Sequence, residues 1–343
     1  MGSSATGIGV LTKRRNVTSI SYHRTVNDLQ GMDWAFGGPF ARTDWFALLE
    51  EAGMSPLIAL AREGDAAIAL PLRAHWQRLA PLANWYAFTF AELRTANAPD
   101  HLLSALARDL ARRTHRIDLG KLPAEDGTLD RLRHAFAQTG WLVFAEPCDT
   151  NHILRLNGRS FAAYLADRPG QLRTTLKRKA KKVAVTLATT FDPADWAAYE
   201  TIYAQSWKPE EGDPALLRAF AQSESAAGRY RFALARHDGE PVAAQFWTVD
   251  GSAAYIHKLA YREDAKPLSP GTTLSAALSE HVIDVDKVQL IDFGTGDDPY
   301  KRDWMEDVRI RWRLTCVRPG KPRNWPFIAR AWARKLVSRP AHG

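Results

Sequence analysis

The sequence predicts an α/β protein with mixed, mostly antiparallel sheets flanked by helices, in which one structural unit occurs twice. Twice along the chain, a helix ended by glycine is followed by a strand, a short turn and a second strand. The chain has 343 residues, a length that favours two domains over one small core. We therefore expect two tandem domains of related fold.

The first copy of this unit lies near the N-terminus. An amphipathic helix runs from Trp45 to Ala52 and is followed by Gly53, a residue that often ends helices. A strand over 59–62, a hairpin turn and a second strand over 67–72 come next.

The second copy repeats this order and extends it. A helix from Phe220 to Ala227 is ended by Gly228, and the Ala-Leu-Ala-Arg motif of 59–62 recurs at 233–236. Further strands are predicted over 242–247, 253–261, 288–293 and 308–317, with a helix from about Thr272 to Ile283. The expected divisions are a disordered leader (1–18), an N-terminal domain (19–155), a C-terminal catalytic domain (156–320) and a basic amphipathic tail (321–343).

Residues 291–304 combine glycines with several reactive side chains in a short segment. The adjacent carboxylates Asp297 and Asp298 follow a strand and two glycines, and Tyr300 and Lys301 come directly afterwards. Asp292 lies within the strand, where a carboxylate is either paired and buried or part of a site. Because sites are often built on the loops that follow strands, we expect this segment to be catalytic.

A second candidate site lies between the strand over 253–261 and the next helix. The loop Lys266-Pro267-Leu268-Ser269-Pro270-Gly271-Thr272-Thr273 opens that helix with small residues. Such a helix start presents backbone N–H groups and the positive end of the helix dipole to an anion. On the preceding strand, Tyr255, His257, Leu259 and Tyr261 are expected to share one face, since strand side chains alternate.

Together the two segments resemble the GNAT-like acyltransferases of the FemAB-related branch. The run Asp-Phe-Gly…Gly-Asp…Tyr-Lys…Trp within 292–304 is similar to the C-terminal signature of that branch. Lys266-x-x-Ser269-x-Gly271 is similar to the GNAT pyrophosphate pattern Arg/Gln-x-x-Gly-x-Gly/Ala, with Lys for Arg and Ser for the first Gly. The resemblance is good over 156–317 and weak over 35–150, which implies two tandem GNAT-like domains, the first a degenerate copy.

The resemblance implies acyl-CoA as co-substrate. Its pyrophosphate would bind the loop over 266–273, and its thioester would lie beside the strand that ends at 259–261. The expected CoA-binding residues are Leu259, Tyr261, Lys266, Ser269, Gly271, Thr272 and Thr273. No metal is expected, because no Cys/His cluster has zinc-ligand spacing.

In acyl transfer to an amine, the amine must lose a proton to a base. The thiolate that leaves must be tolerated or protonated. His257 is a candidate base because imidazole titrates near neutral pH. Asp297 and Asp298 are candidates for binding or deprotonating a substrate ammonium, and Tyr300 for protonating the thiolate. Lys301 is a candidate contact for phosphate or a developing oxyanion. The loop residues rank above His257, and the identity of the general base stays open.

Composition and charge limit the setting. The net charge of +8 favours an anionic partner, and two cysteines cannot form a disulfide framework, which suits the reducing cytosol. No apolar stretch follows the N-terminal basic residues as in a signal peptide, and no run approaches the roughly 18 apolar residues of a membrane span. Nucleic acid is not expected as a partner, because the aromatic residues are not interleaved with the basic runs. We expect a cytoplasmic protein.

Two basic amphipathic stretches remain. The first, over 173–182, fits a solvated surface helix, and the second lies in the tail over 325–337. There Trp325, Ile328, Trp332 and Leu336 fall on one helical stripe, with Arg330, Arg334 and Lys335 away from it. This pattern suits a helix in an anionic membrane interface on the inner face of the cytoplasmic membrane. The alternative is a helix docked on the protein's own core.

The expected function is an acyl-CoA-dependent N-acyltransferase acting on a lipid amine. The segment Thr-Gly-Asp-Asp-Pro-Tyr-Lys-Arg-Asp-Trp over 295–304 is similar to that of bacterial ceramide synthases, which N-acylate sphingoid bases. Three alternatives stay open: an acetyltransferase for a cell-envelope sugar or exopolysaccharide, a FemAB-type aminoacyl-tRNA-dependent transferase that extends a peptidoglycan precursor, and a non-enzymatic nucleic-acid-binding protein.

Overall fold

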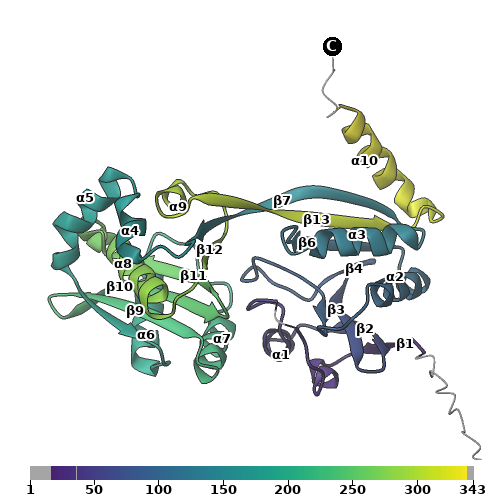
Figure 1. Cartoon of the computed structure of the whole chain (residues 1–343), viewed down its shortest axis with the longest axis horizontal. Coiled ribbons are helices and arrows are strands. Elements are labelled where there is room, and N and C mark those ends of the chain that lie inside the picture. The colour runs from purple at the N-terminus through teal and green to yellow at the C-terminus, as the bar shows by residue number, and fades with distance from the viewer. Residues whose placement is uncertain (1–16, 36, 338–343) are drawn as a thin grey trace, which may run out of the picture.

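The computed structural model describes residues 17–35 and 37–337, so most of the expected leader and the last six residues of the tail lie outside the described residues. Figure 1 shows two lobes, each a sheet with flanking helices, linked by two long strands. The first lobe contains β1 (Ser19–His23), α1 (Thr43–Glu51), β2 (Leu57–Glu63), β3 (Ala66–His75), β4 (Arg78–Pro81), β5 (Leu93–Arg94), α2 (His101–Arg113), β6 (Arg116–Leu122) and α3 (Thr128–Gln138). The strand β7 (Leu142–Arg155) leads from it to the second lobe.

The second lobe contains α4 (Phe161–Ala166), α5 (Gly170–Lys179), β8 (Ala184–Ala188), α6 (Pro193–Ala204), α7 (Pro214–Ala226), β9 (Tyr230–His237), β10 (Glu240–Asp250), β11 (Ala253–Tyr261), α8 (Pro270–Glu280), β12 (Leu290–Thr295) and α9 (Pro299–Trp304). From α7 to β12 this lobe follows the predicted order of helices and strands, while α4, β8, α6 and α9 are not among the predicted elements. The strand β13 (Asp307–Val317) then returns along β7 to the first lobe, where α10 (Trp325–Val337) begins.

One sheet runs through both lobes, in the order β1-β2-β3-β4-β6-β13-β7-β12-β11-β10-β9-β8, with β5 beside β3. The β4–β6 and β11–β12 pairs are parallel and the other described pairs are antiparallel. The predicted fold class, an α/β protein with a mixed, mostly antiparallel sheet flanked by helices, is confirmed. The sheet is continuous across β7 and β13, and the division of the chain into domains at 155 stays a prediction.

The repeated unit is present at both predicted places. Helix α1, Gly53 and the hairpin β2–β3 form the first copy, and α7, Gly228 and the hairpin β9–β10 form the second. Both glycines adopt positive φ, +89° and +73°, a conformation that costs other residues free energy. Local sequence was sufficient here because helix ends and hairpin turns depend on neighbouring residues.

The strand predicted over 288–293 is displaced by two residues, to Leu290–Thr295. Val288 is buried, but its N–H donates to the carbonyl of Val282 instead of joining the sheet. The preceding helix begins at Pro270 and ends in a π-helical turn from His281 to Val285. Val288 therefore serves to close this turn, and the sheet pairing begins later.

The two lobes share a hydrophobic core. Phe40 and Phe88 of the first lobe lie with ring centroids 5.8 Å from that of His257 on β11. Phe220 and Phe246 of the second lobe approach the same imidazole to 5.1 Å. The lobes are thus held together by buried aromatic packing as well as by the sheet.

A buried ion pair network also crosses between the lobes. Arg42 of the first lobe contacts Glu224 at 2.7 Å and Asp250 at 3.1 Å in the second, and all three side chains are largely buried. Burial raises the pKa of Asp250, and Arg42 and Arg229 act in the opposite direction. Removal of Arg42 would leave Asp250 as a buried carboxylate with a weaker counter-charge.

The tail helix α10 packs on the sheet next to β7 and β13. One side of the helix, with Phe327, Ile328 and Ala331, lies against Phe144 and Val317. This side is therefore docked on the protein's own core, as the alternative prediction states. The expected stripe is only partly buried. Ile328 packs on the sheet, and the ring of Trp332 lies edge-on to Phe144 with centroids 6.2 Å apart, but Trp325 and Trp332 are still 58% and 51% exposed. The side chains of Lys335 and Leu336 lie outside the described part. Among residues 17–35 and 37–337, no helix has the length and apolar character required to cross a membrane.

We predict that Arg42→Ala lowers the free energy of unfolding by about 3 kcal/mol, because it leaves buried carboxylates without their cation from the other lobe. Urea denaturation followed by tryptophan fluorescence measures this loss. Arg112→Ala is the control, since Arg112 is 77% exposed and its pair with Asp109 should contribute less than about 1 kcal/mol. Equal midpoints for the two variants would contradict a structural role for the network.

Candidate functional site

Three neighbouring cavities have Lys208 in their linings. The first, the helix-end cavity at the start of α8, has a volume of about 290 Å³. The second, the central cavity between the lobes, has about 240 Å³, and the third, the apolar cavity between α6 and α7, has about 730 Å³. The helix-end and central cavities also share Leu259 and Tyr300. A molecule that reaches from one of these two cavities into the other must therefore pass these side chains.

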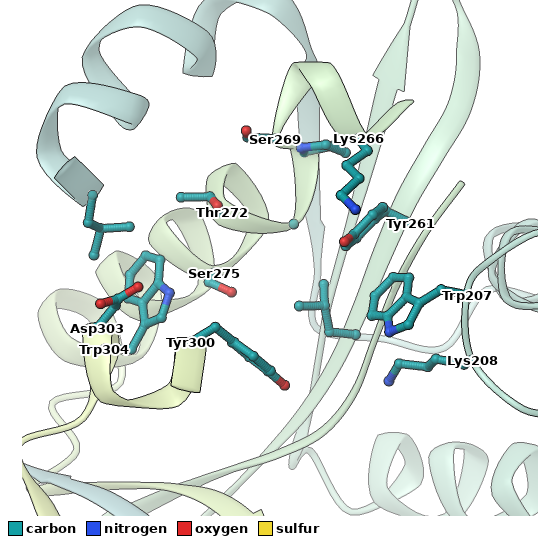
Figure 2. A pocket seen from close by; sticks show the side chains of 14 residues that line it. Trp207, Lys208, Tyr261, Lys266, Ser269, Thr272, Ser275, Tyr300, Asp303 and Trp304 are labelled. Carbon is teal, nitrogen blue, oxygen red and sulfur yellow. The ribbon is translucent and has the colours of Figure 1, made fainter. Parts of the chain in front are cut away.

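The helix-end cavity forms where β11 leads through a 3₁₀ turn (Glu263–Leu268) into α8. Its lining consists of Leu172, Trp207, Lys208, Leu259, Tyr261, Lys266, Ser269, Pro270, Gly271, Thr272, Ser275, Tyr300, Asp303 and Trp304 (Figure 2). The first N–H groups of a helix lack carbonyl partners within it, so this end of α8 can donate to an anion. The cavity thus has the character of an anion site with an aromatic wall.

Six of the seven residues predicted to bind CoA line this cavity, and Thr273 does not. Thr273 is buried, and its N–H donates to the carbonyl of Ser269 at 3.3 Å. Gly271 lies close to β11: a Cβ there would stand 3.3 Å from Tyr261 and 3.4 Å from Leu259. The small residues of this loop are therefore required for the close approach of α8 to the strand.

The basic helix α5 contributes to this cavity. Lys179 donates from Nζ to Oγ of Ser269 at 3.1 Å. Ser269 itself has φ of 52°, in the left-handed region that few residues other than glycine adopt readily. At least one residue of the stretch over 173–182 is thus attached to the loop at the start of α8, where its positive charge would stabilise an anion.

The central cavity brings together segments from the whole chain. Its lining consists of Trp85, Tyr86, Phe88, Lys208, Leu217, Phe220, Ile256, His257, Lys258, Leu259, Phe293, Gly294, Thr295, Asp298, Tyr300 and Lys301. Four consecutive residues of β11 occur in it because a β-bulge interrupts the strand: Trp247 pairs with Ile256 and Phe246 with Lys258, which leaves His257 as the extra residue. The expected strict alternation along β11 is therefore wrong at this point.

His257 is enclosed by aromatic rings, and its Nε2 lies 2.8 Å from the hydroxyl of Thr248. Burial lowers the pKa of His257 to about 3, with Arg42 and Lys258 adding to the effect. The imidazole is therefore neutral at physiological pH, and it is a weak base.

Asp298 and Tyr300 both face the central cavity from the start of α9. Burial, together with the nearby Asp298 and Tyr261, raises the pKa of Tyr300 to about 12. The phenol therefore keeps its proton at neutral pH and can donate it. Figure 2 shows this ring pointing toward the same space as Lys208 and Trp207.

Lys301 holds the loop from beneath. It is buried, and its Nζ donates to the carbonyls of Thr295 and Gly296. Burial lowers the pKa of Lys301, and several carboxylates act in the opposite direction, Asp298 first. The geometry gives this ammonium backbone partners in the loop, although the residue also lines the central cavity.

Asp292 and Asp297 lie outside the three cavities. Asp292 accepts from the Nδ2 of Asn151 at 3.2 Å and from the N–H of Gly294 at 2.8 Å, and Arg311 lies 3.5 Å away. Burial raises the pKa of Asp292, and Arg311 opposes this.

Asp297 turns to the opposite side of the loop from Asp298. It pairs with Arg302 at 2.7 Å and lies 2.8 Å from Nε2 of His152, and these contacts lower its pKa. The two adjacent carboxylates thus belong to different environments.

Lys208 is the main residue that the sequence did not suggest. It lies in the loop between α6 and α7, which has no recognisable motif. Burial lowers the pKa of Lys208 to about 8, and the cation of Lys258 contributes next. Among Lys208, His257 and Tyr300, the amine of Lys208 has the pKa nearest to neutral pH.

A hydrogen-bonded network fixes the loop that carries Lys208. Glu211 accepts from the hydroxyl of Tyr86 at 2.7 Å and pairs with Lys258 at 2.9 Å. Tyr86 also accepts from the N–H of Asp213 at 3.2 Å. The first lobe therefore positions a loop of the second. Within the described ranges, no group of three or more His, Cys, Asp or Glu side chains is placed to hold a metal ion.

Comparison with known proteins identifies one family over part of the chain. Residues 170–302, from α5 into α9, match the family described as Acetyltransferase (GNAT) domain. No curated protein matches the chain.

Several solved structures share the fold at low sequence identity. FemX has a TM-score of 0.60 at 10% identity, over 86% of this chain and 96% of that one. The C-terminal domain of a putative lysylphosphatidylglycerol synthetase from Agrobacterium fabrum has 0.58 at 13%, over 85% and 90%. L-PGS from Bacillus licheniformis has 0.57 at 11%, over 84% and 90%.

We predict that Lys208 titrates near pH 8, whereas an ordinary lysine titrates near 10.4. Labelling with an amine-reactive reagent over a pH series, read by mass spectrometry of the Lys208 peptide, gives the midpoint. Lys258→Gln should raise this midpoint, because it removes a neighbouring cation, while Lys321→Gln at the far end of the molecule should not. A wild-type midpoint near 10 would show that water reaches the amine freely.

Proposed function

We propose that this protein, an N-acyltransferase with a GNAT domain over 170–302, transfers an acyl group from acyl-CoA to the amine of a lipid, such as a sphingoid base. The observation that carries the proposal is the meeting of the helix-end and central cavities at Lys208, Leu259 and Tyr300. A donor in the first cavity and an amine in the second would meet at these residues.

A GNAT domain implies an acyl-CoA co-substrate in general. In this chain the pyrophosphate would accept from the N–H groups at the start of α8, with Lys266 and Lys179 nearby. The pantetheine arm would then run along Leu259 and Tyr261 toward Lys208. This arrangement brings the thioester to the bulge at His257, where β11 departs from regular pairing.

The reaction forms a C–N bond and breaks the C–S bond of the thioester. We assign the proton of the attacking amine to Lys208, whose pKa of about 8 leaves roughly a tenth of it neutral at pH 7. Asp298 would hold the incoming ammonium, which loses one proton to solvent to become the attacking amine. Tyr300 would give its proton to the departing thiolate and regain one from the Lys208 ammonium. His257, with its pKa of about 3, would orient the site by packing and by its contact with Thr248.

A lipid acceptor has two sources of support. The sequence over 295–304 resembles that of bacterial ceramide synthases, and two similar folds carry the name of lysylphosphatidylglycerol synthetase or its abbreviation. The likeness to FemX keeps a FemAB-type transferase as the second candidate. A lipid extract offered with acyl-CoA and, in parallel, a peptidoglycan precursor offered with aminoacyl-tRNA distinguish the two.

The exposed side of α10 would bring such an enzyme to its substrate. Trp325 and Trp332 are both more than half exposed next to basic residues, an arrangement that suits an anionic lipid surface. Sedimentation with anionic liposomes should remove the intact protein from solution, and a Trp325→Ala/Trp332→Ala variant should sediment less. Equal sedimentation of both would place any membrane contact elsewhere.

We predict that Gly271→Asp weakens CoA binding by about tenfold or more, equivalent to about 1.4 kcal/mol, because it adds negative charge beside the expected pyrophosphate. Isothermal titration calorimetry measures the dissociation constant. Gly271→Ala is the matched control, since it introduces the same close contacts with Tyr261 and Leu259 without the charge. Equal affinities for the two variants, both folded, would move the pyrophosphate away from this loop.

We predict that Asp298→Asn and Tyr300→Phe each lower kcat/KM by about 100-fold, the usual range for loss of a group that positions or transfers a proton. Both changes are nearly isosteric, so melting temperatures should stay close to that of the wild type. Asp297→Asn discriminates between the adjacent carboxylates and should retain most of the activity, because Asp297 lines a separate cavity beside His152 and Arg302 and not the central cavity. The reverse order of effects would transfer the role to Asp297.

A further inference from the structure

We infer that the apolar cavity between α6 and α7 binds the hydrocarbon chain of the acceptor amine, so that the enzyme selects long-chain amines over short ones. This inference rests on the proposed function and adds to it the place and the class of the acceptor. The cavity has a volume of about 730 Å³, within the range of roughly 300–1,000 Å³ typical of sites for small molecules.

The surface of this cavity is apolar and aromatic where it is deepest. Trp196, Tyr199 and Leu217 are buried side chains that line it, and Tyr203 lines it between them and Lys208. Ala204 and Ala215, near the facing ends of α6 and α7, lie at its open side. A flexible alkyl chain gains free energy in such a cavity mainly by leaving water, without needing specific polar partners.

Two carboxylates in the lining already have partners. Glu200 accepts from the indole N–H of Trp196 at 3.0 Å and from Nε of Arg218 at 3.1 Å. Glu211 accepts from Tyr86 and pairs with Lys258. Glu210, the third carboxylate of the lining, is exposed to water. With Glu200 and Glu211 compensated, the cavity is a poor site for a further charged group and a suitable one for hydrocarbon.

The apolar cavity is closer in composition to the central cavity than to the helix-end cavity. It shares Lys208 and Leu217 with the central cavity, and only Lys208 with the helix-end cavity. Glu211 in its wall also bonds to Tyr86 and Lys258, which line the central cavity. A chain in the apolar cavity therefore continues from the acceptor rather than from CoA, with its amine close to Lys208 and Asp298.

The test compares hexylamine with dodecylamine as acceptors for one fixed acyl-CoA. Each methylene that is buried should raise kcat/KM by about fourfold. Burial of roughly half or more of the extra methylenes of dodecylamine should therefore give the wild type a preference for it of about 100-fold or more. Ala204→Phe and Ala215→Phe place a ring at the open side of the cavity and should lower this preference by about tenfold or more. Ala197→Phe is the matched control, because Ala197 is an exposed alanine of α6 outside the cavity lining.

An unchanged preference in Ala204→Phe and Ala215→Phe, with normal melting temperatures, would overturn the inference. The inference would also be overturned if Ala204→Phe and Ala215→Phe kept the preference for long amines but lost a preference for long acyl chains on the donor. The cavity would then hold the acyl group. If the wild type acylates neither amine, the proposed function fails separately. In that case the binding of dodecylamine, measured by calorimetry, tests the inference. An affinity about tenfold lower in Ala204→Phe and Ala215→Phe than in the wild type supports it, and an affinity equal to that of the wild type overturns it.

Discussion

The pairing of β7 with β13 is the constraint on which the rest of the structure depends. The two strands pair from Leu142 opposite Val317 to Ile153 opposite Asp307, and they join the lobes in one sheet. The same ladder brings Asn151 and Arg311 to Asp292, which is 2% exposed and could not remain there ionised without such partners. Asp292 in turn accepts from the N–H of Gly294, so the loop that carries Asp298 and Tyr300 is held in place from below.

The first lobe completes the site in the second. A Cβ at Gly294 would stand 3.2 Å from the ring of Phe88, and the φ of 68° at this position also disfavours any residue other than glycine. Tyr86 donates to Glu211 in the loop before α7. Arg42 joins the lobes through buried carboxylates. The first lobe is therefore required for the site, because it supplies one wall of the central cavity and fixes the loop of Lys208.

The pKa values of the lysines in the central cavity are lowered by burial, and that of Lys208 also by the positive charge of neighbouring lysines. Lys208, Lys258 and Lys301 all line this cavity, and burial is the largest cause of the lowered pKa in each. Lys258 pairs with Glu211, and Lys301 donates to a backbone carbonyl. These contacts hold both ammonium groups in place. Lys208 therefore loses its proton at lower pH than an ordinary lysine, as a base near neutral pH requires.

The sequence by itself determined the repeated helix–glycine–strand–turn–strand unit, the further strands and the helix of its second copy, and the loops over 266–273 and 297–301. These depend on hydrophobic periodicity, glycine conformation and helix starts, which act between residues close along the chain. Only the tertiary structure decided that Asp298 faces the central cavity while Asp297 faces His152, and that a bulge at His257 brings Lys258 into the lining. A one-residue change in register reverses the side of the sheet that a residue faces. No local pattern in the sequence of β11 predicts the bulge that causes this change. The role of Lys208 could likewise not be predicted from the sequence. The lowered pKa of its amine arises from burial between segments that are distant along the chain and meet only in the folded protein.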